Sequence, residues 1–309
     1  MGNLPPVCAA SVTPVDVTGS VDTPKLAAHC RWLLDNGCDG IVLFGTTGEA
    51  ASFGIGERQA VLEAMLASGI QADQLVIGTG CCSVEDTVVL SRHALQQGCA
   101  GVLVHPPYFF RPASNAGILA FFVGVVEALG SDACGLILYH FPEATGAPIS
   151  QTLIRQLTDR YPGVFVGIKD STGCLEDMLA VVQRFPELKV FTGDDHLLWP
   201  LLEAGGHGAI TATANLVPNL LAQVREDWPS KSEAVCTAHE KLSLLWEDVL
   251  LKFPVSEAVK DVIASVSGDE GWRALRPPLL PLSAPRNAQL VQLTAPFEIQ
   301  FPEGLGREA

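Results

Sequence analysis

Charged side chains are scarce in this sequence, and basic ones are scarcer than acidic ones. Asp, Glu, Lys and Arg make up 17% of the 309 residues, and 19 basic against 34 acidic side chains give a formal net charge of −15. A protein of that charge repels nucleic acid and anionic lipid, so we expect neither as a partner. Hydrophobic residues make up 48% of the chain, which provides a sizeable core and argues against disorder.

Signals for export and membrane insertion are missing as well. Residues 1–11 lack the basic segment and long apolar run of a secretory signal peptide. No apolar run approaches the roughly 20 residues that span a bilayer. The nine cysteines include no C-x-x-C pair, and a chain with this much apolar content does not need disulfides. These absences predict a cytoplasmic protein with reduced thiols.

The usual marks of a nucleotide or metal site are also absent. No G-x-G-x-x-G follows the first predicted strand, so a dinucleotide site has no support. Cys81 and Cys82 are adjacent, and adjacent residues seldom both reach one ion. Asp194 and Asp195 are adjacent too and lack an evident third ligand, so a solvated loop or contacts to substrate hydroxyls explain them better. We therefore expect no metal and no cofactor.

Short apolar runs rich in β-branched residues alternate with helical patterns along residues 1–215. Eight such runs at roughly 30-residue spacing predict an α/β fold, a closed (β/α)8 TIM barrel, with an open doubly wound sheet as the alternative. The predicted strands are Val7–Val12, Gly40–Phe44, Leu75–Gly78, Gly101–Val104, Gly135–Tyr139, Val164–Ile168, Lys189–Thr192 and Ala209–Ala212. Apolar spacing of i, i+3 and i+4 predicts the helices Thr23–Asn36, Gly56–Ser68, Val84–Gln97, Asn115–Leu129, Ser150–Arg160 and Leu175–Arg184.

The pattern changes after Asn215. Residues 216–309 show no evident strand, which predicts a C-terminal helical extension packed on the barrel of residues 1–215. Its predicted helices are Val217–Arg225, Ser230–Leu251 and Ser256–Val266. We expect no regular structure where prolines recur, at Pro277, Pro278, Pro281 and Pro285. Residues 295–309 are expected to form a short tail.

The segment G-V-F-V-G-I-K-D-S-T-G at 163–173 ends a buried strand on a lysine, Lys169. The carboxyl ends of barrel strands are where such enzymes hold their catalytic groups. Burial disfavours the charged form of an amine, and the neutral amine is the nucleophile. Taken alone, the segment is explained more simply by a lysine that extends into solvent.

Other strand ends change that balance. Gly-Thr-Thr-Gly, with Thr46 and Thr47, follows the second predicted strand and offers hydroxyl and backbone N–H donors to a small carboxylate. Tyr139 ends the fifth strand and is placed to move protons. Tyr108 and Phe109 lie in a stiff, proline-rich loop that either walls a pocket or packs at a subunit interface. Together with a lysine, these groups suit Schiff-base chemistry on a 2-oxo acid.

Several motifs, in this order and spacing, resemble those of one family across roughly residues 5–283. It is the dihydrodipicolinate synthase / N-acetylneuraminate lyase family of class I, pyruvate-handling lyases. The motifs are Gly45-Thr46-Thr47-Gly48-Glu49-Ala50, Pro107-Tyr108-Phe109, Leu138-Tyr139-x-x-Pro142, Gly167-Ile168-Lys169-Asp170, Gly193-Asp194-Asp195, Gly205-Gly206-His207-Gly208-Ala209-Ile210 and Arg276-Pro277-Pro278.

The resemblance implies a role for each matching residue. Lys169 would form the imine, Tyr139 would shuttle protons, Thr46 and Thr47 would bind the pyruvoyl carboxylate, and Ile210 would be a pocket wall. The resemblance also implies a homotetramer built as a dimer of dimers, with active sites near the dimer contact.

Two positions depart from the synthase pattern. The synthase has an arginine two residues after the proline of its tyrosine motif, to hold the carboxylate of its second substrate, and Ala144 stands there in this chain. The synthase relay also uses a tyrosine supplied across the dimer, and Phe109 occupies that position. Losing a charge-assisted carboxylate contact costs about 1.5–3 kcal/mol. The Tyr-x-x-Pro-x-Ala-Thr-Gly pattern is closer to that of 2-keto-3-deoxy sugar-acid aldolases.

The sequence therefore predicts a lyase that reversibly cleaves a 2-keto-3-deoxy acid to pyruvate and an aldehyde. The alternatives are a synthase that condenses pyruvate with aspartate semialdehyde, a sugar-acid dehydratase using the same imine, and a neuraminate lyase. Outside enzymes, a sensor that binds a 2-oxo acid remains an alternative. Neither the identity nor the stereochemistry of the aldehyde follows from the sequence.

Overall fold

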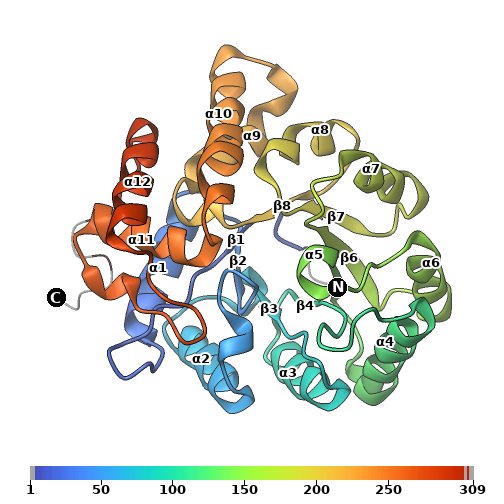
Figure 1. The fold of residues 1–309 in the computed structure, drawn as a ribbon. Helices are drawn as coiled ribbons and strands as arrows, with labels where there is room; N and C mark the ends of the chain where they lie inside the picture. The colour runs from blue at the N-terminus through green and yellow to red at the C-terminus, as the bar shows by residue number, and fades with distance from the viewer. Residues whose placement is uncertain (1–3, 303–304, 306–309) are drawn as a thin grey trace.

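The computed structural model describes residues 4–302 and 305, and its centre is a closed barrel of eight parallel strands (Figure 1). Each strand pairs with the next along the chain, and β8 closes the ring on β1. The strands are β1 (Val7–Ala10), β2 (Gly40–Leu43), β3 (Leu75–Gly78), β4 (Gly101–Val104), β5 (Leu136–His140), β6 (Phe165–Asp170), β7 (Lys189–Thr192) and β8 (Gly208–Thr211). The predicted TIM barrel is confirmed, with strand ends that differ from the prediction by a few residues.

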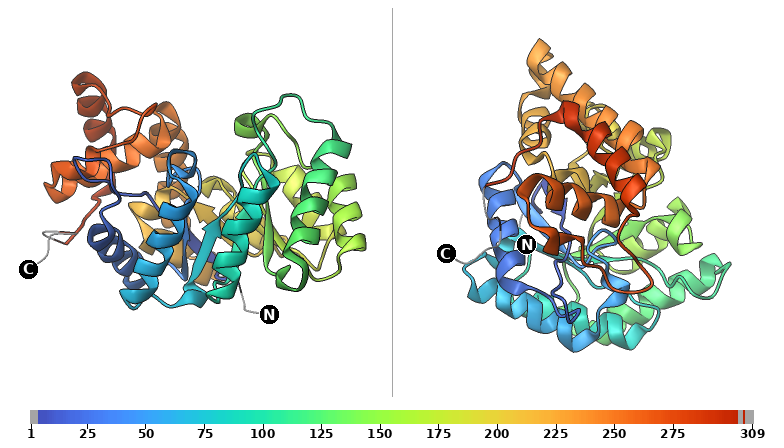
Figure 2. Two further views of the ribbon diagram at one scale, coloured as in Figure 1. Left: turned by 90° about the horizontal axis from the view of Figure 1, so that it is seen from below. Right: turned by 60° about the vertical axis from the view of Figure 1, so that its left-hand side comes forward.

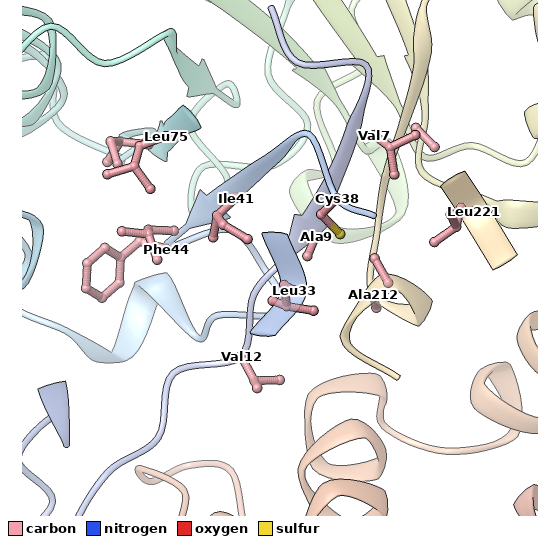
Figure 3. Close-up of a cluster of buried hydrophobic side chains, with 14 of the residues drawn as sticks. Val7, Ala9, Val12, Leu33, Cys38, Ile41, Phe44, Leu75, Ala212 and Leu221 are labelled. Atoms are coloured by element: carbon pink, nitrogen blue, oxygen red, sulfur yellow. The ribbon is translucent and has the colours of Figure 1, made fainter. Parts of the chain in front are cut away.

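Alternation along the strands divides the core into two layers. Successive side chains of a strand point to opposite faces, so every second residue enters the barrel. The interior is filled by a compact cluster that includes Val42, Val76, Leu103, Ile137 and Ile210. The residues between them pack outward against the helices. Figure 3 shows part of this outer layer, where Ile41 of β2 lies near Leu33 of a neighbouring helix.

Within residues 4–302, eight helices surround the barrel, and hydroxyl or carboxylate side chains cap several of them. Asp22, Ser83, Ser114 and Ser150 each accept a hydrogen bond from a backbone N–H of the first helical turn. The ring consists of α1 (Thr23–Asp35), α2 (Ile55–Ala67), α3 (Val84–Gln96), α4 (Asn115–Leu129), α6 (Gln151–Arg160), α7 (Leu175–Arg184), α8 (Leu198–Glu203) and α9 (Pro218–Asp227). Neither α8 nor the one-turn helix α5 (Pro142–Thr145) was predicted, because both are too short for a periodic pattern.

The helices after the ring gather over one side of the barrel (Figure 2). They are α10 (Glu233–Leu244), α11 (Val255–Ser267) and α12 (Ala284–Thr294). The predicted helix over 230–251 begins three residues later than predicted, at Glu233, and only its part up to Leu244 is α-helical, although helical turns continue to Lys252. Ser232 caps α10, and a wider π-helical turn at Leu245–Val249 followed by a 3₁₀ turn ends it. The domain division at residue 215 stays a prediction, and α9 just beyond it lies against β1 and α8.

Two expectations for the C-terminal region need correction. Pro285 does not exclude regular structure, because it lies in the first turn of α12, where a missing N–H has no partner within the helix. The described part of the predicted tail also packs on the fold. The Phe301 ring lies 4.7 Å from that of Trp32, and Leu305 is buried. Residues 303–304 and 306–309 of the predicted tail are outside the described residues.

One segment of the described chain, Asn115–Asp132, is long and apolar enough to cross a membrane by length and composition alone. It contains α4, a helix that was predicted from the sequence but was not counted among apolar runs long enough to span a bilayer. This helix lies in the outer ring between α3 and α6 and buries Phe122 and Val125. A core helix of a soluble protein passes the same test, so a single segment of this kind is weak evidence for a membrane span.

All nine cysteines are free thiols.

Candidate active site

Lys169 and Tyr139 are partners across two neighbouring strands. Tyr139 of β5 is in register with Lys169 of β6, and both side chains enter the barrel. Their exposed fractions are 6% for Lys169 and 4% for Tyr139. The lysine Nζ donates to the tyrosine hydroxyl at 3.4 Å and lies 4.4 Å from the centre of the ring. Lys169 therefore does not extend into solvent, as the simpler interpretation of its strand had it.

A third polar group continues this line. The Thr46 hydroxyl, in the loop after β2, is 3.2 Å from the Tyr139 hydroxyl. Five of the seven candidate site residues line one cavity of about 540 Å³: Thr46, Thr47, Tyr139, Lys169 and Ile210. They lie in the loop after β2 and on β5, β6 and β8, at one end of the barrel, so strand-end position alone brings them together.

The conformation of the loop that carries the two threonines depends on two residues with positive φ angles and on a buried ion pair. Phe44 and Glu49, at its ends, have φ values of 55° and 59°, in the left-handed region. Gly78 makes room for the first of them, because a Cβ there would overlap the Phe44 carbonyl. Glu49 forms an ion pair with Lys260 of α11 in which neither side chain is exposed. The lysine also donates to the Ala274 carbonyl at 2.9 Å.

Part of the cavity wall comes from the C-terminal extension, which the sequence analysis did not connect with the site. Trp246, Ser256 and Glu257 line the cavity beside the barrel residues. Burial raises the pKa of the Glu257 carboxyl. No local signal marks these residues, because their place depends on how the extension docks on the barrel. Ser171 and Thr172 also line the cavity. They could have been predicted from the sequence, since they directly follow the end of β6.

Asp194 and Asp195 have different environments, as expected for adjacent carboxylates. Asp194 lines the cavity, and the Trp246 indole N–H donates to its Oδ1 at 2.9 Å. Asp195 is fully buried outside the cavity and accepts a hydrogen bond from Thr213 just after β8. Burial raises the pKa of both carboxyl groups, in Asp195 to about 7. Among the described residues no group of three or more His, Cys, Asp or Glu could hold a metal ion, and the absence of a metal stays an expectation.

Tyr108 and Phe109 are not among the residues that line the Lys169 cavity. Tyr108 lines a neighbouring cavity of about 290 Å³, which shares Thr46 and Tyr139 with the first. Phe109 is 75% exposed and packs edge-to-face on Phe110, which is 79% exposed. The loop thus leaves two aromatic rings in contact with solvent.

Comparison with known sequences places this arrangement in a family. The Dihydrodipicolinate synthetase family matches residues 3–295. The chain belongs to this family. Its solved members include dihydrodipicolinate synthase from Agrobacterium tumefaciens, which is 33% identical with a TM-score of 0.88, over 94% of this chain and 98% of that one. The resemblance stated from the motifs is confirmed.

Two further relatives of this Dihydrodipicolinate synthetase family member point toward lyase and aldolase chemistry. A protein of Chloroflexus aurantiacus described as an uncharacterized DapA-like lyase is 36% identical over 293 residues, 94% of this chain and 95% of the relative. YagE of Escherichia coli, described as a putative 2-dehydro-3-deoxy-D-gluconate aldolase, is 31% identical over 298 residues, 94% of this chain and 95% of the relative. A crystal structure of YagE in complex with pyruvate has a TM-score of 0.86, with 27% identity over 95% and 99% of the two chains. The chain is accordingly an aldolase-type lyase.

Proposed function

We propose that this lyase cleaves a 2-keto-3-deoxy acid reversibly to pyruvate and an aldehyde through a Schiff base on Lys169. The observation that carries the proposal is the line from the Lys169 amine through the Tyr139 hydroxyl to the Thr46 hydroxyl, with separations of 3.4 and 3.2 Å. Imine formation requires loss of water from a carbinolamine, so a proton donor must lie within reach of the amine. Tyr139 has that position.

The reaction then follows from the chemistry of an imine. The Lys169 amine attacks the C2 carbonyl, and water leaves with a proton supplied through Tyr139. Thr46 and Thr47 offer their hydroxyl groups to the carboxylate of the substrate. Tyr139, which has given up its proton to the departing water, takes the proton of the C4 hydroxyl, the C4–O electron pair forms the aldehyde carbonyl, and the protonated imine accepts the electron pair of the C3–C4 bond. Protonation of the resulting enamine at C3 and hydrolysis release pyruvate and restore the amine.

The charges around the cavity favour an uncharged aldehyde. Glu143, Asp194 and Glu257 line it, and among its described lining residues Lys169 is the only lysine or arginine. A second carboxylate, such as that of aspartate semialdehyde, would meet negative charge without a counter-charge. Hydroxyl groups of a sugar-derived aldehyde would instead find acceptors in these acids and in Ser171 and Thr172. The aldolase name of the YagE relative agrees with this choice.

Trapping with borohydride tests the Schiff base. Reduction in the presence of pyruvate should add the mass of one reduced pyruvate to the protein, and the Lys169→Ala variant should gain none. A gain that survives in that variant, or none in the unchanged protein, contradicts the proposal. Incubation with 2-dehydro-3-deoxy-D-gluconate then identifies the reaction. Pyruvate plus an aldehyde supports the aldolase, a dehydrated oxo acid supports the dehydratase, and binding of pyruvate without turnover of any aldehyde supports the sensor.

We further propose that the enzyme is a cytoplasmic homotetramer, assembled as a dimer of dimers. The exposed Phe109 and Phe110 support an interface between subunits, because removing two aromatic rings from water at a subunit contact lowers the free energy of the assembly. Sedimentation analysis of the unchanged protein should give a tetramer, and Phe109→Ser with Phe110→Ser should lower the assembly state. A tetramer that withstands both substitutions would assign the interface to another surface.

A further inference from the structure

Glu257 is a mostly buried carboxylate on the wall of the Lys169 cavity, and it has no partner on another residue. It is 8% exposed and lines that cavity from the first turn of α11. Among the described residues, no other residue donates a hydrogen bond to its carboxylate and no ion pair includes it. Asp194 Oδ2 is closed off from the accessible surface, whereas neither Glu257 oxygen is a buried atom of that kind. A donor that enters the cavity can therefore reach the Glu257 carboxylate.

The charges beside Glu257 leave its carboxylate without a counter-charge of its own. Burial raises the pKa of this carboxyl, and the negative charge of Glu49 raises it further. The backbone N–H of Glu257 itself and the Lys260 ammonium act in the opposite sense. This lysine, however, already donates to Glu49 and to the Ala274 carbonyl. A desolvated carboxylate in a substrate cavity, with no donor from another residue, points to a donor on the substrate.

The start of α11 is fixed on the loop that carries Thr46. The Ser256 hydroxyl donates to the Thr46 carbonyl at 3.5 Å, and Lys260, one helical turn later, forms the buried ion pair with Glu49. Glu257 lies between these two contacts along the helix, so its backbone is held in place before a substrate binds. An acceptor whose position is fixed in advance loses little freedom when it binds a ligand, which makes it suited to selecting one.

We propose that Glu257 is a specificity-determining residue, whose carboxylate accepts a hydrogen bond from a substrate hydroxyl group beyond C4, at C5 or C6. The inference rests on the aldolase function proposed above and narrows the aldehyde to one with hydroxyl groups on the carbons that follow its carbonyl. Lys169 and Tyr139 carry out the bond chemistry, so Glu257 affects the aldehyde half of the substrate and not the pyruvate half. An aldehyde without hydroxyl groups would leave the carboxylate desolvated and without a donor, which disfavours its binding.

Condensation of pyruvate with two aldehydes of the same carbon-chain length tests the assignment. Glyceraldehyde carries hydroxyl groups on both carbons that follow its carbonyl, and propionaldehyde carries none. Glu257→Leu should lower kcat/KM for glyceraldehyde about 10- to 100-fold, as expected for loss of a hydrogen bond to a charged group. Its kcat/KM for propionaldehyde should fall by no more than about threefold, and the rate of borohydride trapping with pyruvate should also stay within about threefold of that of the unchanged protein.

Glu233→Leu is the matched control, because Glu233 also lies in the first turn of a helix, α10, and lines neither cavity. Its kcat/KM should be unchanged for both aldehydes. Glu257→Gln keeps the size of the side chain and loses its charge, so this variant decides the case in which Glu257→Leu fails to fold. Its kcat/KM for glyceraldehyde should fall about threefold or more, because a neutral acceptor forms the weaker hydrogen bond.

Urea unfolding separates recognition of a substrate from support of the fold. Removing a buried carboxylate that has no partner on another residue should leave the free energy of unfolding of Glu257→Gln unchanged or higher. A carboxylate that supports the fold through its own contacts would lower it.

Three results would overturn the assignment. One is a kcat/KM for glyceraldehyde in Glu257→Leu, or in Glu257→Gln where the leucine variant does not fold, that equals that of the unchanged protein. The second is an equal loss for both aldehydes, and the third is a loss of stability in Glu257→Gln. Failure of the unchanged protein to form the pyruvate adduct would instead refute the proposed function, so the two failures are distinguishable.

Discussion

Glu49 and Lys260 form an ion pair in which both side chains are fully buried, and the pair joins the loop that carries Thr46 and Thr47 to α11. The same carboxylate accepts the Arg276 backbone N–H at 3.4 Å through its other oxygen. Glu49 thus belongs to the support of the loop and is not among the residues that line the Lys169 cavity. The Thr46 carbonyl is a further link, since it accepts the Ser256 hydroxyl of α11 at 3.5 Å.

Breaking this pair from one side should destabilise the protein. Lys260→Met leaves a buried carboxylate without its counter-charge, which costs about 3–5 kcal/mol of the free energy of unfolding. The double variant Glu49→Gln with Lys260→Met removes both charges and should recover part of that loss. Urea unfolding of the three proteins measures both effects. Because the loop carries Thr46 and Thr47, KM for pyruvate should rise in Lys260→Met more than kcat falls. An equally low stability in the single and double variants would contradict the pairing.

Removal of the Tyr139 hydroxyl should slow imine formation while the fold stays intact. Tyr139→Phe keeps the ring that contacts the Lys169 ammonium and loses only the proton donor 3.4 Å away. General acid–base groups contribute about 10²–10⁴-fold to a rate, so adduct formation with pyruvate should slow at least 100-fold. The rate of adduct formation is measured by adding borohydride at successive times after mixing with pyruvate and determining the fraction of protein that carries the reduced adduct. The matched change Tyr161→Phe, at a tyrosine outside both cavities, should leave trapping as fast as in the unchanged protein.

The stability of the protein should depend on pH through Asp195. Burial raises the pKa of this carboxyl to about 7, so between the ordinary carboxyl pKa near 4 and pH 7 the folded protein binds more protons than the unfolded chain. Stability therefore falls as pH rises through that window, by up to about 4 kcal/mol. The buried His29, whose pKa is lowered to about 4, acts in the opposite sense between pH 4 and 6.5.

The difference between the unchanged protein and Asp195→Asn isolates the carboxyl from the histidine. Asparagine keeps an acceptor for the Thr213 hydroxyl and does not ionise. We expect the variant to gain stability relative to the unchanged protein as pH rises from 5 to 8, as measured by urea unfolding at several pH values. A difference that is constant between pH 5 and 8 would show that Asp195 is already ionised at pH 5 in the folded protein, so that its pKa is not raised.

An arginine in place of Ala144 should widen the choice of aldehyde. Ala144 lines the smaller cavity next to Tyr139, at the position where the synthase has an arginine. Ala144→Arg supplies a guanidinium that can bind a carboxylate, an interaction of about 1.5–3 kcal/mol. That corresponds to a gain of about tenfold or more in kcat/KM for condensation of pyruvate with aspartate semialdehyde, while the rate of pyruvate trapping stays the same. Ala144→Gln is the uncharged control and should give no such gain.

Position relative to a strand end decided which residues could be predicted from the sequence. Lys169, Tyr139 and Thr46 directly follow or end apolar runs, and a closed barrel brings all such positions to one rim. Trp246 and Glu257 could not be placed in this way, because they lie on an extension whose docking depends on contacts far apart in the chain. Pro285 was misjudged for a different reason. A proline is compatible with a first helical turn, and α12 begins there.

The division of the cavity wall between the barrel and the extension has an evolutionary consequence. The barrel supplies the amine, the phenol and the threonines, whereas α11 and the turn after α10 supply Trp246, Ser256 and Glu257. Under the proposed function, substitutions in residues 245–257 can therefore change the choice of aldehyde while Lys169 and Tyr139 stay as they are. In this architecture a new substrate can be acquired by exchanging one short helical segment, and the inherited reaction need not be rebuilt.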